Sequence, residues 1–171
     1  MNFDEYAAHD ALGLAELVRK GEVSVAELEE TARRGIEAVN GTINAVVGDV
    51  PLAEGRQETS SDAVFHGVPF LLKDLAHGYA GVPCEMGSRM GVGYINSAES
   101  VYGTRCKASG LVAVGRTNTP EFGQSGTTEP VANGSTLNPY DLAVSAGGSS
   151  GGAAAAVAAG VVPIAHASDA G

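Results

Sequence analysis

The segment GVPFLLKD, residues 67–74, places a lysine directly after a nearly unbroken apolar run. A continuous apolar run such as Val68 to Leu72 is typical of a strand buried on both faces of a sheet. Leu111 to Val114 is a second run of this kind, and Ile43 to Val47 and Val161 to Ala165 are further strand candidates. Helical patterns separate these runs, so the sequence predicts an α/β fold.

The first 40 residues are predicted to be helical. One helix is expected over Ala11 to Lys20. Ser24 and Glu27 have the spacing of a capping box, in which the serine accepts a hydrogen bond from an unpaired amide and the glutamate reaches back. A second helix is therefore expected to begin at Val25 and to end near Val39, closed by the pair Asn40-Gly41.

Three further helices are expected along the chain. Ser97 is predicted to cap a helix over Ala98 to Ser109, Pro51 to Glu58 a short polar helix, and Ala153 to Ala159 a helix of small residues. Gly78 to Tyr94 is rich in glycine and short polar residues and is expected to be an irregular loop. No composition change marks an internal domain boundary.

Charge excludes several classes of partner. The 171 residues include 10 basic and 20 acidic side chains, a net charge of -10, which disfavours nucleic acids and anionic membranes. Cys84 and Cys106 have neither the number nor the spacing of a zinc site. The acidic start lacks the apolar region of a secretory signal, and no apolar run approaches the roughly 20 residues of a membrane span. We therefore expect a cytoplasmic protein without nucleic-acid or membrane partners.

Lys73 is the first candidate for chemistry. The chain has only three lysines, and this one follows the predicted buried strand. Burial disfavours the charged ammonium and lowers its pKa, and a lysine that is neutral near pH 7 can act as a general base. The alternatives are an ion pair with Asp74 or a side chain that extends to the surface.

The second candidate is the sequence GGSSGG at residues 147–152, which precedes the predicted helix of small residues. It is consistent with a phosphate cradle at a helix N-terminus, although the GxxxxGK[ST] pattern is absent. It is also consistent with a flexible linker, against which the adjoining alanine-rich helix argues. The third interpretation is a site that fixes a serine hydroxyl for proton transfer.

The end of the chain, HASDAG at residues 166–171, predicts a tight turn whose successive amides could form an anion-binding nest. The four histidines, His9, His66, His77 and His166, are scattered along the sequence. Their spacing gives no support to a Ser-His-Asp triad.

Four segments in this order resemble the amidase signature family: GVPFLLKD at 67–74, GRTNTPEF at 115–122, SAGGSSGG at 145–152 and SDAG at 168–171. The resemblance covers roughly residues 5–171, the N-terminal third of a typical member. It implies the N-terminal part of the amidase signature fold, a mixed, largely parallel sheet flanked by helices on both faces. Residues 1–171 would form one incomplete domain, with a helical N-terminal layer over 1–42 and the start of the α/β core over 43–171.

The resemblance also implies a Ser-Ser-Lys triad. Lys73 matches the base and Ser149 the bridging serine, which the family holds through a cis peptide bond. The nucleophilic serine closes the motif D-x-G-G-S and would fall two residues beyond Gly171, so the chain is expected to be truncated just before it. Ala170 and Gly171 match oxyanion-hole positions. Supporting roles are expected for Ser150, Ser168, Asp169 and Thr127.

The implied activity is hydrolysis of non-peptide C–N amide bonds, linear or cyclic, through an acyl-enzyme and without a metal or organic cofactor. The partner would be a small-molecule amide, with a homodimer as a candidate assembly. The residues Thr127 to Pro130, and His166 before Ala167, resemble those of hydrolases that act on cyclic amides. The alternative is a non-catalytic fragment or a subunit that needs a partner chain, such as a tRNA-dependent amidotransferase A-type subunit.

Overall fold

The computed structural model describes residues 1–51 and 60–169. The helix predicted over Pro51 to Glu58 falls almost wholly outside the described residues, and so do Ala170 and Gly171.

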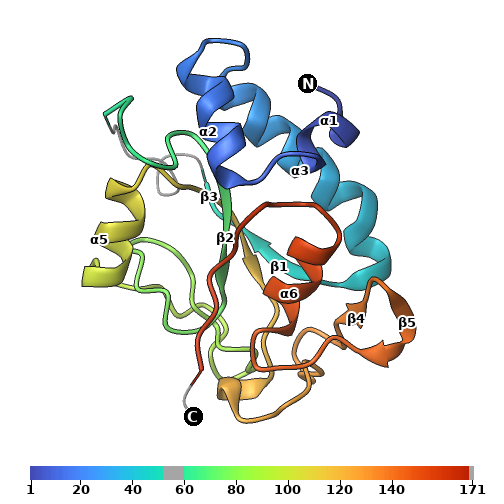
Figure 1. Cartoon of the computed structure of the whole chain (residues 1–171). Helices are drawn as coiled ribbons and strands as arrows, with labels where there is room; N and C mark the ends of the chain where they lie inside the picture. The colour runs from blue at the N-terminus through green and yellow to red at the C-terminus, as the bar shows by residue number, and fades with distance from the viewer. Residues whose placement is uncertain (52–59, 170–171) are drawn as a thin grey trace.

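A three-stranded sheet forms the centre of the described structure (Figure 1). Its strands are β1 (Val46–Asp49), β2 (Pro69–Lys73) and β3 (Val112–Thr117), in the order β1-β3-β2. β2 runs parallel to β3 and β1 antiparallel to it, so the sheet is mixed, as expected. Every residue of β2 and β3 is buried, which confirms the interpretation of their apolar runs.

Three helices precede this sheet, α1 (Phe3–Ala7), α2 (Ala11–Arg19) and α3 (Val25–Ile43). The capping box of α3 is confirmed: Ser24 Oγ accepts from the Glu27 amide at 3.2 Å, and Glu27 Oε2 accepts from the Ser24 amide at 2.8 Å.

The predicted end of α3 at Asn40-Gly41 is wrong. The helix continues to Ile43 and closes at Asn44, which adopts the left-handed conformation at φ 48°. The Asn40 side chain instead binds both backbone groups of Val46, at 2.7 and 2.8 Å. Asparagine here fixes the start of β1 rather than ending the helix, and β1 therefore begins three residues later than expected.

The predicted cap of the next helix is also wrong. Helix α5 spans Val101–Ala108 and begins after Ser100, not Ser97. Ser100 Oγ accepts from the Gly103 amide at 2.9 Å, and the Ser100 amide donates to Gly78 O at 2.7 Å. The loop that carries Gly78 thus selects which serine caps the helix.

The rest of the chain consists of short elements. After β3 come a 3-10 turn (Glu121–Gly123), a hairpin of β4 (Leu137–Asn138) and β5 (Asp141–Ser145), and helix α6 (Gly151–Ala158). The strand predicted over Val161 to Ala165 is reduced to a parallel bridge between Ala165 and Leu71, extended by a bond from the His166 amide to Leu71 O at 2.8 Å. The tail of the described chain therefore runs beside β2.

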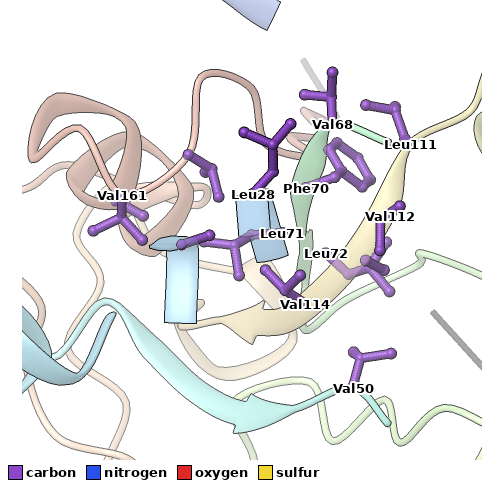
Figure 2. Close-up of a cluster of buried hydrophobic side chains, with 14 of the residues drawn as sticks. Leu28, Val50, Val68, Phe70, Leu71, Leu72, Leu111, Val112, Val114 and Val161 are labelled. Carbon is purple, nitrogen blue, oxygen red and sulfur yellow. The ribbon is translucent and has the colours of Figure 1, made fainter. Parts of the chain in front are cut away.

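Helices α3 and α6 pack against β2 and β3, and Figure 1 shows α5 on the opposite side of β2. The core between these layers contains Leu28 of α3, Leu71 of β2 and Val114 of β3 (Figure 2). The expected arrangement of helices on both faces of the sheet is confirmed for the described part of the chain. Among the helices described, none combines the length and the hydropathy that crossing a membrane requires.

We predict that Ser100→Ala lowers the free energy of unfolding by about 1 kcal/mol, because the Gly103 amide loses its cap. Ser97→Ala is the matched control, since Ser97 is exposed and precedes the cap. Urea unfolding of both variants measures the difference. Equal losses would contradict the assignment of Ser100 as the cap.

Candidate active site

Lys73 is the last residue of β2 and its side chain is completely buried. Its Nζ lies 2.7 Å from Ser149 Oγ and donates to Ser168 O at 3.0 Å. Asp74, the next residue, binds Arg116 at 2.6 Å instead. The two alternatives for Lys73, an ion pair with Asp74 and a side chain extended to the surface, are therefore wrong.

Burial is the main influence on the charge of Lys73. It lowers the pKa of the lysine, while the carboxylate of Asp169 opposes this shift. The lysine is thus held in surroundings that favour the neutral amine, the form with a lone pair available for a proton.

Ser149 is held by its backbone on both sides. The Gly148–Ser149 peptide bond is cis, as the resemblance implies. Thr119 Oγ1 donates to Ser149 O at 2.9 Å, and Thr128 Oγ1 donates to Gly147 O at 2.8 Å. A Cβ on Gly148 would lie 2.8 Å from Ser125 O, so only glycine fits against this loop. These contacts fix the Ser149 hydroxyl beside the lysine.

The helix N-terminus after Ser149 is already occupied by protein groups. The Gly151 amide donates to Thr128 Oγ1 and the Gly152 amide to Asn118 O, both at 3.2 Å. These two amides are not directed at an anion, which argues against the phosphate cradle. Gly151 and Gly152 are buried, which excludes the flexible linker. The geometry favours the third interpretation, a fixed serine hydroxyl.

The expected supporting residues have different surroundings. Ser150 and Ser168 bind each other: Ser150 Oγ donates to Ser168 O at 3.2 Å and lies 3.3 Å from the Ser168 amide. Ser168 contacts Lys73 through its main-chain oxygen. Asp169 is exposed. Thr127 is also exposed, and its hydroxyl lies 3.3 Å from Ser125 Oγ.

A cavity of about 690 Å³ opens beside the Lys73–Ser149 pair. Leu75 and Phe122 give it an apolar wall, while Gln124, Ser149 and Asp169 supply polar groups. This combination of an apolar wall with a few polar groups is typical of sites for small organic molecules.

Sequence reasoning missed two threonines that position Ser149. Thr119 lies within GRTNTPEF, a segment that the sequence does single out, but nothing in the pattern shows which side chain faces the serine. Thr128 follows Thr127, the residue that the resemblance indicates instead. Which of two adjacent threonines points inward depends on the path of the loop and is not visible in the sequence.

The class of protein follows from this fold together with the ordered segments around Lys73 and Ser149. The family model for Amidase matches residues 27–171. The chain therefore belongs to the amidase signature family, as the resemblance predicts.

The comparisons with individual proteins agree with this. The chain is 45% identical over 166 residues to the 6-aminohexanoate-cyclic-dimer hydrolase of Paenarthrobacter ureafaciens, covering 94% of this chain and 33% of that protein. It is 39% identical over 165 residues to the putative amidase AmiC of Mycobacterium tuberculosis, covering 95% of this chain and 35% of that protein. The predicted similarity to hydrolases of cyclic amides is confirmed, and the chain spans about a third of the length of these relatives.

Solved structures show the same relationship. A structure of 6-aminohexanoate cyclic dimer hydrolase matches with a TM-score of 0.86 and 40% identity, covering 94% of this chain and 34% of that one. A glutamyl-tRNA(Gln) amidotransferase structure from Thermotoga maritima matches with a TM-score of 0.70 and 27% identity, covering 95% of this chain and 32% of that one.

His166 gives this region a pH-dependent stability. Its ring packs on Tyr102 at 4.6 Å between centroids, and burial, aided by His77 and Lys73, lowers its pKa from 6.5 to about 4. Between these values the unfolded chain binds the proton and the folded chain does not. Stability is therefore lost as the pH falls from 6.5 to 4, by about 3 kcal/mol from this residue.

We predict that His166→Phe, which keeps an aromatic ring on Tyr102, removes this part of the acid-induced loss. Urea unfolding at pH 7 and pH 4 measures it as a difference between the protein and the variant. His9→Gln, at an exposed histidine, is the matched control and should retain the full loss. The same loss in His166→Phe as in the unchanged protein would contradict the assignment.

Proposed function

We propose that the polypeptide containing this segment hydrolyses C–N amide bonds of small molecules, with Lys73 as general base and Ser149 as bridging serine. One observation carries the proposal: a completely buried amine lies 2.7 Å from a serine hydroxyl that the surrounding backbone holds in place. The family membership and the amidase relatives support the reaction class.

In the proposed mechanism, neutral Lys73 accepts the proton of Ser149 while Ser149 accepts that of a nucleophilic serine, which attacks the amide carbonyl. This nucleophile is the serine expected to close the D-x-G-G-S motif after Gly171. The backbone amides at Ala170 and Gly171 would face the oxygen on which negative charge develops.

The same relay then runs in reverse. Lys73 returns the proton through Ser149 to the leaving amine, and an acyl-enzyme forms. Water, deprotonated by the same relay, cleaves the acyl-enzyme and restores the serine. The protons and the two bonds exchanged balance without a metal or an organic cofactor.

The substrate class follows from the relatives and the cavity. The apolar wall of Leu75 and Phe122 suits the hydrocarbon part of an organic amide, and the polar groups suit the amide itself. The similarity to the cyclic-dimer hydrolase favours a cyclic or linear non-peptide amide. An amidotransferase component that needs companion chains is the alternative, supported by the structural match at 27% identity. The higher identity to the hydrolases favours hydrolysis.

We predict that Lys73→Met lowers amide hydrolysis by about 10²–10⁴-fold, because the general base is lost. The unchanged protein should become more active as the pH rises through the pKa of Lys73, since the neutral amine is the active form. Lys20→Met, at an exposed lysine, is the matched control. The assay uses the purified full-length protein without companion chains. Unimpaired hydrolysis in Lys73→Met would exclude the base role, and hydrolysis only with companion chains would favour the amidotransferase.

We predict that a fluorophosphonate labels one serine that follows Gly171 in the full-length protein and no serine within residues 1–171. Labelling should be slowed in Ser149→Ala, because the relay to the base is broken, and retained in Ser97→Ala. Peptide mass mapping locates the adduct. An adduct on Ser149 itself would contradict its role as the bridging residue.

A further inference from the structure

A buried ion cluster lies next to the proposed base without touching it. It consists of Arg116, Asp74 and Glu85, and is called here the Arg116 cluster. Arg116 Nη1 lies 2.6 Å from Asp74 Oδ1, and both Nη1 and Nη2 lie 3.3 Å from Glu85 Oε2. Asp74 is completely buried and Arg116 is 6% exposed. Burial of this kind is costly, so the cluster must be kept paired.

The sheet places the cluster on the opposite side of the strand end from the Lys73 amine. Successive side chains along a strand point to opposite faces, and Asp74 directly follows Lys73. On β3, Arg116 is the partner of Leu72, while Thr117 is the partner of Lys73. β1 leaves room for the guanidinium through Gly48, where any Cβ would collide with Arg116.

The charge of Asp74 matters to the lysine because the two residues are adjacent and buried. Burial raises the pKa of Asp74, and Arg116 opposes this shift. Without the guanidinium, a buried anion beside Lys73 would favour the ammonium form and raise the pKa of the lysine. The base would then be protonated at a pH at which it should be neutral.

We propose that Arg116 is a positioning residue for the base: it binds Asp74 and thereby denies Lys73 an anionic partner at the end of its own strand. The amine of Lys73 then stays uncharged and directed at Ser149. This inference rests on the proposed function of Lys73.

Other charged groups act on the same residues. Asp169 and His166 act on Lys73, and His77 lies within the field of Asp74, Arg116 and Glu99. His77 is itself held neutral: its Nδ1 accepts from the Tyr79 amide at 3.1 Å, and its Nε2 lies 2.9 Å from Pro83 O. The substitutions below leave all these groups in place, so shifts between variants report on the Arg116 cluster.

A purely structural role for the cluster is the competing explanation. Asp74 O accepts from the Met86 amide, and Met86 O accepts from the Phe122 amide, so the cluster also anchors the loop that reaches the cavity. Loss of this anchor would lower kcat without moving the pH at which the base loses its proton. The pH profile therefore distinguishes the two roles.

The experiment compares pH profiles of amide hydrolysis by the full-length protein and three variants. In Arg116→Met the acidic limb should move to higher pH by about one unit, because Asp74 is left uncompensated. In Asp74→Asn, which keeps an acceptor oxygen for Arg116 and the Glu85 amide, it should move to lower pH. The double variant should return close to the unchanged protein. Arg33→Met, which breaks the separate pair with Asp49, is the control and should not move it.

Limbs that stay fixed, or that move in the same direction in both single variants, would overturn the proposal. If Arg116→Met does not fold, Asp74→Asn decides alone: a limb at lower pH supports the proposal and an unmoved limb overturns it. A ¹³Cε titration of Lys73, assigned by its absence from Lys73→Met, measures the same shifts without turnover. Absence of hydrolysis in the unchanged protein would refute the proposed function, while the titration would still test the Arg116 cluster.

Discussion

The hydrogen-bonding contact between Lys73 Nζ and Ser149 Oγ connects parts of the chain that are far apart in sequence. The lysine ends a central strand, the serine precedes α6, and Ser168 supplies a carbonyl from the segment beside β2. Each segment is placed by backbone bonds of its own. A buried amine requires such placement, because neither water nor a carboxylate at the end of its own strand satisfies it.

Much of the fold could be predicted because the signals were local. The apolar runs gave β2 and β3, and the Ser24–Glu27 spacing gave the start of α3. The errors arose where a distant residue decided between local options. Gly78 selects Ser100 as the cap, and Val46 engages the asparagine that was expected to end α3. Tertiary contacts of this kind leave no trace in a single segment.

For the site, the sequence could supply residue types but not their partners. Lys73 and Ser149 stood out as a lysine after an apolar run and a serine between glycines, and the structure brings them together. Thr119, Thr128 and the pairing of Asp74 with Arg116 could not be foreseen, because each depends on how two loops or two strands meet. The positions Ala170 and Gly171 lie outside the described residues.

The contact of Lys73 with Ser168 is made through a main-chain oxygen. Every amino acid carries that oxygen, so this contact constrains the route of the polypeptide and not the side chain at position 168. Natural variants can therefore exchange the residue there without losing this contact, provided that the route is preserved. A comparison of aligned sequences would record such a position as variable, although the lysine depends on it.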